Sequence, residues 1–205
     1  MTGDRPILIV VAGPNGSGKT TITKKLLMHQ WMQGCEYINP DEIAQHEFGG
    51  WNDQTSILKA AQRAEQIRNT CIADRKSLAL ETVFSADDKV EFIKAAHKAG
   101  FFIRVFFVCT SEPSINITRV GRRVLEGGHE VPMNKIISRY YKSIANCVTV
   151  APLVDRLYFY DNSAENEDAK LLFKVKEGVI AKIYEDLEPW AEDIVDAIPK
   201  EHSAV

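Results

Sequence analysis

The sequence has few features that would cross-link the chain or insert it into a membrane. Its four cysteines, Cys35, Cys71, Cys109 and Cys147, are spread over 205 residues without a C-x-x-C pair, which argues against a disulfide scaffold and a structural zinc site. The longest apolar run, Ile7–Ala12, is far shorter than the roughly 20 residues of a membrane-spanning helix. The N-terminal residues also lack the apolar length and cleavage site of a signal peptide. We therefore expect a cytoplasmic protein with reduced thiols and no membrane partner.

The chain also has no surplus of positive charge. It carries 25 Lys and Arg against 28 Asp and Glu, a net charge of −3 with histidine neutral. Binding to nucleic acid regardless of its sequence relies on excess basic charge, so we expect no nucleic-acid partner. The hydrophobic share of 45% is ordinary for a globular domain. Because no linker, repeat or low-complexity stretch interrupts the chain, we expect one domain over residues 1–205.

Short apolar segments alternate with longer helical ones, an order that is typical of a parallel sheet with helices on both faces. The apolar and helical spacing predicts strands at residues 6–12, 36–39, 77–82, 101–109 and 156–160, and helices at 20–31, 54–75 and 87–99. Residues 113–148 are helical again, with a turn at Gly127-Gly128. Two further apolar segments, 171–176 and 179–184, flank Glu177-Gly178 and predict a hairpin. Hairpin and tail together occupy about residues 170–198.

The strongest motif follows the first predicted strand and precedes the first predicted helix. It reads G-P-N-G-S-G-K-T and matches the phosphate-loop pattern G-x-x-x-x-G-K-S/T. Glycines allow the backbone N–H groups to point inward around an anion, and the following helix adds its positive N-terminal end. Lys19 then reaches the β- and γ-phosphates, and the Thr20 hydroxyl ligates Mg²⁺. The expected ATP-binding residues are Gly13, Pro14, Asn15, Gly16, Ser17, Gly18, Lys19, Thr20 and Thr21.

Other motifs decide which class of phosphate-loop protein is expected. A GTPase needs Asn-Lys-x-Asp, but Asn134-Lys135 is followed by two isoleucines. An ABC-type ATPase needs a Leu-Ser-Gly-Gly-Gln signature and an acidic strand end, whereas the fourth predicted strand ends in V-C-T-S. The pattern therefore favours a small kinase.

Two acidic residues follow predicted strands and are candidates for the chemistry. Asp41 comes after the second strand and Glu81 closes the third. Ligands of parallel sheets bind outside the carboxyl ends of the strands, so both carboxylates should face the γ-phosphate region. There a carboxylate accepts a proton from an attacking hydroxyl or holds a Mg²⁺-bound water. The alternatives are that Asp41 caps a helix and that Glu81 is a buried, hydrogen-bonded structural acid.

A basic cluster, Arg119, Arg122 and Arg123, lies in the helical region, with Arg139 further along. Residues three or four apart share a helix face, and convergent guanidinium groups stabilise the charge of a transferring phosphoryl group. The alternative is a solvated basic face. With the phosphate loop present, we interpret residues 113–148 as a lid whose arginines close over the phosphates.

Together these segments resemble the zeta-toxin-like P-loop kinases, in particular the solitary chromosomal group often labelled predicted ABC-type ATPases. The resemblance is carried by G-P-N-G-S-G-K-T-T at 13–21, Y-I-N-P-D-E-I-A at 37–44, L-E-T-V-F-S at 80–85, R-V-G-R-R-V-L-E-G-G-H-E-V-P at 119–132 and R-Y-Y-K-S at 139–143. It implies an α/β, nucleotide-kinase-like P-loop NTPase fold of three layers. The expected sheet has five parallel strands in the order 2-3-1-4-5, plus the C-terminal β-hairpin.

The resemblance also implies the reaction. Zeta toxins are kinases that phosphorylate the 3′-hydroxyl of the amino sugar of UDP-N-acetylglucosamine. It implies that Lys19 and Thr20 bind ATP and Mg²⁺ and that Asp41 is the base. The lid arginines Arg119, Arg122 and Arg123 would be catalytic, and Glu81, Thr82 and Arg139 would bind the acceptor. An antitoxin protein is a further implied partner.

Two alternatives remain open at this point. One is an ATP-binding switch with slow hydrolysis, whose lid closure is read by a protein partner. The other is a kinase for a different acceptor, such as a nucleotide, a sugar or a polynucleotide 5′-hydroxyl.

Overall fold

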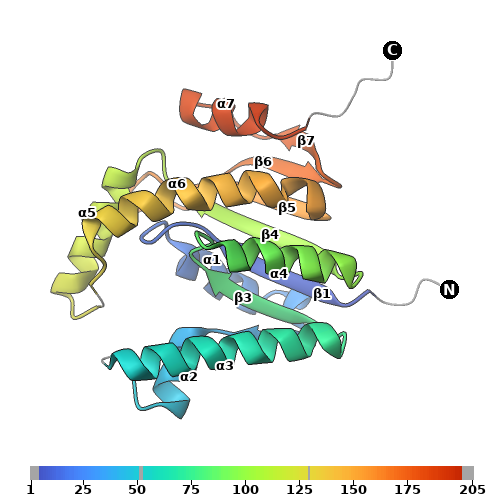
Figure 1. Ribbon diagram of the computed structural model, residues 1–205. Coiled ribbons are helices and arrows are strands. Elements are labelled where there is room, and N and C mark those ends of the chain that lie inside the picture. The colour runs from blue at the N-terminus through green and yellow to red at the C-terminus, as the bar shows by residue number, and fades with distance from the viewer. Residues whose placement is uncertain (1–4, 51–52, 129, 200–205) are drawn as a thin grey trace.

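The computed structural model describes residues 5–50, 53–128 and 130–199. Its strands are β1 (Ile7–Ala12), β2 (Glu36–Ile38), β3 (Leu78–Thr82), β4 (Phe102–Cys109), β5 (Arg156–Asp161), β6 (Lys170–Lys176) and β7 (Val179–Ile183). They form one sheet in the order β2-β3-β1-β4-β5-β6-β7 (Figure 1). The first five are parallel, so the predicted order 2-3-1-4-5 is confirmed. The hairpin of β6 and β7 pairs antiparallel with β5, so the sheet has seven strands instead of five.

The two central strands are β1 and β4, and their composition explains their place. Both consist mainly of β-branched, aliphatic and aromatic residues, and most of these are buried, as expected for parallel strands covered on both faces. Val10 illustrates the register, because it lies between Leu80 of β3 and Val105 of β4.

Helices cover the two faces of the sheet unequally. They are α1 (Lys19–Leu27), α2 (Pro40–Glu47), α3 (Gln54–Ala73), α4 (Asp87–Lys98), α5 (Pro113–Leu125), α6 (Met133–Val150) and α7 (Pro189–Asp196). In Figure 1, α3, α4, α6 and α7 lie in front of the sheet and α1 lies behind it. The larger hydrophobic core fills the front layer, and a smaller one joins Leu26 of α1 to Val11 and Phe106 on the back. The predicted three-layer arrangement is therefore confirmed.

Several helix ends differ from the prediction. The helix expected to reach residue 31 ends at Leu27, and a separate 3₁₀ turn (Gln30–Met32) follows because the His29 ring accepts a hydrogen bond from the Trp31 N–H. A second 3₁₀ turn (Ala151–Leu153) extends α6 toward β5. The segment 113–148, which the sequence predicts to be a lid, forms two helices, α5 and α6, with a turn at Gly127 between them. Within the described ranges, no helix has the length and apolarity needed to span a membrane.

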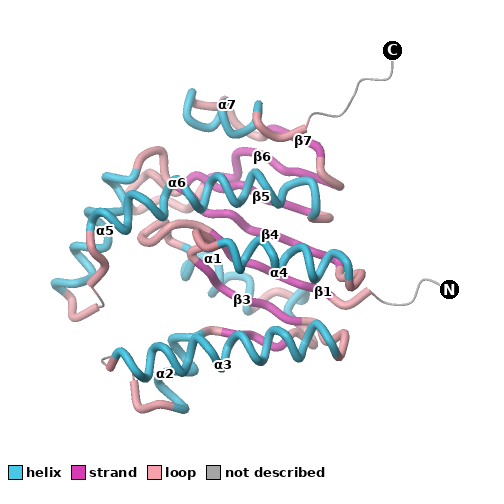
Figure 2. Tube along the Cα trace, viewed as in Figure 1, coloured by secondary structure: helices cyan, strands magenta, loops and turns pink. Residues whose placement is uncertain are grey.

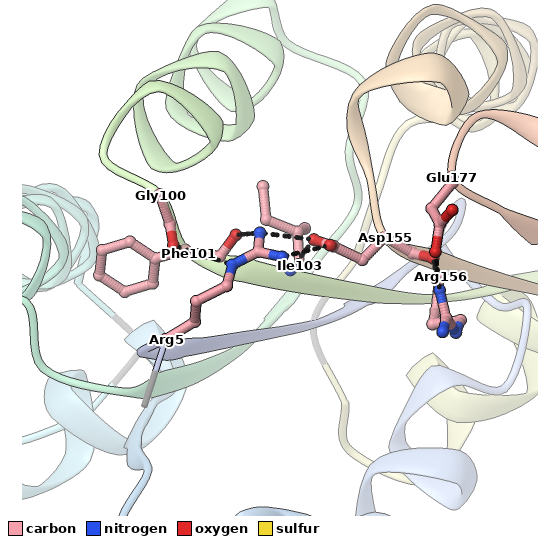
Figure 3. A network of polar contacts seen from close by, with 7 residues as sticks. All are labelled: Arg5, Gly100, Phe101, Ile103, Asp155, Arg156 and Glu177. Carbon is pink, nitrogen blue, oxygen red and sulfur yellow. Dashed lines mark hydrogen bonds and ion pairs between the residues drawn. The ribbon is translucent and has the colours of Figure 1, made fainter. Parts of the chain in front are cut away.

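A polar network ties together the amino ends of three strands (Figure 3). Arg5, just before β1, forms a 2.7 Å ion pair with Asp155, just before β5. The other carboxylate oxygen of Asp155 accepts the Ile103 N–H of β4 at 2.9 Å, and Arg5 also donates to the Phe101 carbonyl at 2.5 Å. The loops at the opposite, carboxyl ends gather on the side where α5 lies (Figure 2). The network therefore stabilises the sheet away from the loops that carry the candidate site.

Candidate active site

The glycine-rich segment 13–18 connects β1 to α1. Gly16 and Gly18 have φ angles of 77° and 92°, which side-chain-bearing residues rarely adopt. A Cβ atom at Gly18 would lie 2.1 Å from Nδ2 of Asn162, and one at Gly13 would lie 2.0 Å from the Val108 carbonyl oxygen. Glycine is thus required both by the backbone conformation and by close neighbours. All nine residues expected to bind ATP lie in this loop and the first turn of α1.

Lys19 is the first residue of α1 and is only 8% exposed. Its ammonium group donates to the Pro14 carbonyl at 2.9 Å, inside the loop. Burial lowers the pKa of Lys19 to about 8, helped by the charge of Arg123 and opposed by the carboxylates of Glu81 and Asp41. The side chains of β3, α2 and α5 that the sequence singled out therefore act on the same ammonium group.

Glu81 connects β3 to α1. Its carboxylate accepts hydrogen bonds from the hydroxyls of Thr23 at 2.8 Å and Thr20 at 3.3 Å. It therefore holds the hydroxyl that is expected to ligate Mg²⁺, and its negative charge favours a cation beside that hydroxyl. Glu81 is thus hydrogen-bonded, as its alternative role required, although it is only half-buried; the sequence did not predict Thr20 and Thr23 as its partners.

Asp41 is not the residue that caps α2. The residue that caps α2 is Asn39, whose side-chain oxygen accepts the Asp41 N–H at 3.0 Å, and Pro40 is the first helical residue. Asp41 is exposed at the start of α2, and within the described chain no hydrogen bond or ion pair engages its carboxylate. That carboxylate is therefore available to a ligand beside the phosphate loop.

The arginines divide into two pairs. Arg119 donates to the carbonyls of Asn162 at 2.7 Å, Ser163 at 3.3 Å and Ala164 at 3.1 Å. Arg122 forms a 3.2 Å ion pair with Glu165, so this pair lies against the loop between β5 and β6.

The second pair lies beside the phosphate loop. Arg123 acts on the charge of Lys19, and Arg139 of α6 donates to the side-chain oxygen of Asn15 at 3.3 Å. Helical spacing grouped the three arginines of α5, but tertiary contacts separate Arg119 and Arg122 from Arg123.

Thr82 lies at the end of β3 and shapes the turn that follows. Its hydroxyl accepts the Phe84 N–H at 3.1 Å, and Phe84 has a φ angle of 62°. Asn146 and Ser143 of α6 bind the carbonyls of Phe84 and Val83 at 3.0 and 2.6 Å. These two α6 residues fix the loop after β3 beside the candidate acceptor region; Ser143 closes the R-Y-Y-K-S segment, whereas the sequence did not single out Asn146.

A crevice of about 150 Å³ opens next to Gly18. It is lined by the start of α1, by Arg119 and by residues of the loop after β5, including Asn162, Asn166 and Asp168. The sequence did not predict the contribution of this loop. The signal that could have found it is the polar run D-N-S-A-E-N-E-D at 161–168, which follows a parallel strand at its carboxyl end.

No group of three or more His, Cys, Asp or Glu side chains that could hold a metal ion occurs among the described residues. Mg²⁺ in kinases is usually held by one or two protein oxygens together with phosphate oxygens and water. The exposed Thr20 hydroxyl, with Glu81 behind it, fits that mode of binding.

Comparisons with known proteins agree with this geometry. A family model described as "Zeta toxin" matches residues 1–170. An uncharacterized protein of Haemophilus influenzae is 25% identical over 134 residues, which cover 64% of this chain and 91% of that protein.

Two solved structures resemble nearly the whole chain. One is from the PezAT chromosomal toxin–antitoxin system of Streptococcus pneumoniae, with 15% identity and a TM-score of 0.63 over 97% of this chain and 80% of that one. The other, AvrRxo1-ORF1:-ORF2 with ATP, has 16% identity and a TM-score of 0.66 over 99% of this chain and 66% of that one. At these identities the similarity shows a shared fold.

Proposed function

Because this chain belongs to the zeta toxin family of P-loop kinases, we propose that it transfers the γ-phosphoryl group of ATP to a hydroxyl of a small molecule, most specifically of a nucleotide sugar such as UDP-N-acetylglucosamine. The single observation that carries this proposal is the buried Lys19 ammonium, whose charge is influenced by Glu81, Asp41 and Arg123 from three different elements. A phosphate loop alone binds nucleotides, whereas a loop flanked by an exposed carboxylate and arginines has the parts that phosphoryl transfer needs.

The nucleotide would occupy the loop and the crevice beside it. Backbone N–H groups of the segment that follows Pro14 would bind the phosphates, and the crevice near Arg119 and Asn162 would receive the base. Thr20 would hold Mg²⁺, which neutralises charge on the β- and γ-phosphates when bound. Glu81 would orient the Thr20 hydroxyl.

The acceptor would lie between α2 and α6. Asp41 would accept the proton of the attacking hydroxyl, because its carboxylate is exposed and not used as a helix cap. Arg123 and Arg139 would stabilise the charge of the transferring group, because both lie by the phosphate loop. Arg119 and Arg122 would instead hold the loop after β5 in place around the base.

Asp41→Asn tests the assignment of the base. We expect kcat to fall by about 100-fold or more, while the Kd of Mg·ATP stays within about twofold because the phosphate loop is unchanged. Glu47→Gln is the matched control, since Glu47 is an exposed carboxylate of the same helix that pairs with Arg63. Turnover of Asp41→Asn at the wild-type rate would show that another group is the base. Tight ATP binding without turnover on sugars, nucleosides or oligonucleotides would favour the ATP-binding switch.

We further propose a protein partner that acts as an antitoxin and place the reaction in the cytoplasm. In support, one structural neighbour comes from a toxin–antitoxin system and another was solved as a complex of two gene products. Expression of the chain alone should slow growth of the host cell, and Lys19→Ala should relieve this effect. Equal growth with and without active protein would contradict the proposal.

A further inference from the structure

Two asparagines outside the phosphate-loop motif hold its backbone. Asn116 of α5 donates its side-chain N–H to the Asn15 carbonyl at 2.6 Å. Asn162, directly after β5, donates in the same way to the Ser17 carbonyl at 2.9 Å. The loop is thus held at two alternate carbonyls by side chains from two distant elements.

The geometry of the peptide bond gives these contacts a consequence. In a trans peptide the C=O and the following N–H point in opposite directions. Holding the Asn15 carbonyl toward α5 therefore turns the Gly16 N–H away from α5, and holding the Ser17 carbonyl toward Asn162 turns the Gly18 N–H away from Asn162. An anion-binding loop needs its N–H groups directed inward in this way.

Glycine makes such external anchors necessary. Gly16 and Gly18 have no Cβ to restrict the backbone, so their peptide planes would otherwise rotate at little cost. We propose that Asn116 and Asn162 are positioning residues, which fix the direction of the Gly16 and Gly18 N–H groups toward the phosphates of the nucleotide. This inference rests on the proposed ATP-dependent function.

Asn116 is itself fixed by a buried chain of hydrogen bonds. Its side chain is fully buried, and its amide oxygen accepts a hydrogen bond from the hydroxyl of Thr110, which is also fully buried. The Tyr140 hydroxyl of α6 donates to the Thr110 carbonyl at 2.5 Å. An asparagine amide has one accepting and one donating end. Because the Asn15 carbonyl can only accept, it takes the donating end, and the Thr110 hydroxyl donates to the accepting end.

The second anchor is also connected to α5. The backbone carbonyl of Asn162 accepts a hydrogen bond from Arg119 at 2.7 Å, and its backbone N–H donates to the Cys109 carbonyl at 2.8 Å. A Cβ at Gly16 would lie 2.8 Å from the Asn116 carbonyl, so α5 packs directly on the loop. One helix therefore carries the candidate lid arginines and supports both anchors of the phosphate loop.

Asn116→Asp and Asn162→Asp test the proposal because each keeps the side-chain shape and replaces the donor by an acceptor. Calorimetry would give the Kd of Mg·ATP at a temperature where circular dichroism shows each variant folded. We expect each variant to raise Kd by about tenfold or more, since one lost hydrogen bond plus one repulsive contact exceeds ~1.4 kcal/mol. The control is Asn134→Asp, at an exposed asparagine in the first turn of α6.

Thr110→Val provides a second test that does not change the asparagine. It should weaken Mg·ATP binding severalfold, and Thr110→Ser should restore wild-type affinity because it keeps the hydroxyl. The control here is Thr118→Val, which removes an exposed hydroxyl that bonds within α5 itself. The combination of Thr110→Val with Asn116→Asp should weaken binding less than the product of the two single effects.

The outcomes separate the inference from its premise. If the wild-type protein binds Mg·ATP and the asparagine variants bind it equally well, even with lowered melting temperatures, the asparagines are only structural and the inference is wrong. If the wild-type protein does not bind Mg·ATP, the proposed function itself is wrong and the inference falls with it. Failure of Asn116→Asp to fold leaves Asn162→Asp and Thr110→Val to decide by the same criterion.

Discussion

We expect the affinity for ATP to fall about tenfold between pH 7 and pH 9, because binding depends on the charge of one buried lysine. Burial lowers the pKa of Lys19 from 10.5 to about 8 in the ligand-free protein. Phosphate groups favour the charged ammonium, so a bound nucleotide raises this pKa again. Binding is therefore strong below pH 8, where Lys19 is already protonated, and weakens above pH 8, where binding must be accompanied by proton uptake.

The magnitude follows from the same values. If phosphate restores the pKa of Lys19 to 10.5, Kd rises in inverse proportion to the fraction of Lys19 that is protonated in the free protein, which gives about tenfold from pH 7 to pH 9. At ~1.4 kcal/mol per pH unit, complete restoration is worth roughly 3 kcal/mol of binding free energy at high pH. Cys109 and Tyr37 do not titrate between pH 7 and pH 9, because burial raises the pKa of each to about 12.

The assay is calorimetric titration with Mg·ATP at several pH values from 7 to 9 and constant ionic strength. Lys19→Gln is the control, since it cannot change its charge. This variant should bind more weakly than the wild type at pH 7 and show no pH dependence over the same range. A wild-type Kd that stays constant from pH 7 to pH 9, or an equal slope in Lys19→Gln, would refute the assignment.

Two further predictions concern the loop and the opposite end of the sheet. Gly18→Ala should raise the Kd of Mg·ATP at least tenfold, because the new Cβ would lie 2.1 Å from Asn162 and would displace the loop. Gly34→Ala, at a φ angle of 76° with no atom within 4 Å of a Cβ, should lower stability by roughly 1–2 kcal/mol and leave Kd unchanged. Asp155→Ala removes the partners of Arg5 and of the Ile103 N–H, so urea unfolding should show a loss of roughly 1–3 kcal/mol with unaltered Kd. Equal Kd values in Gly18→Ala and Gly34→Ala, or a raised Kd in Asp155→Ala, would contradict this account. It holds that residues at the carboxyl end of the sheet bind the nucleotide and those at the amino end only stabilise the fold.

The fold could be predicted largely from local patterns. Apolar runs such as Ile7–Ala12 and the glycine at position 100 delimit strands and helices by short-range rules, and the phosphate loop depends on residues that are adjacent in the sequence. The sequence did not predict that the C-terminal hairpin pairs with β5. Contacts between distant segments decide which edge of a sheet a hairpin joins. Stacking of Phe159 against Phe173 is one such contact.

The roles of individual residues in the candidate site were harder to predict, because neighbouring residues of similar type can serve the same local purpose. Asn39 and Asp41 are both good capping residues, and only the backbone conformation shows that Asn39 is the cap. Helical spacing places Arg119 and Arg123 on one face, but it does not say which neighbour each one contacts. Asn116 and Asn162 bind the phosphate loop across 101 and 145 residues of sequence, a separation at which a single sequence shows no pairing.

The most direct test of phosphoryl transfer is ³¹P NMR of the wild-type protein with Mg·ATP and UDP-N-acetylglucosamine, next to a matched Asp41→Asn sample. We predict a new phosphomonoester resonance that grows with the ADP signal in the wild-type sample and is absent from the variant. Formation of ADP and free phosphate without a new ester would contradict the proposed acceptor. A new ester in both samples would contradict the role of Asp41.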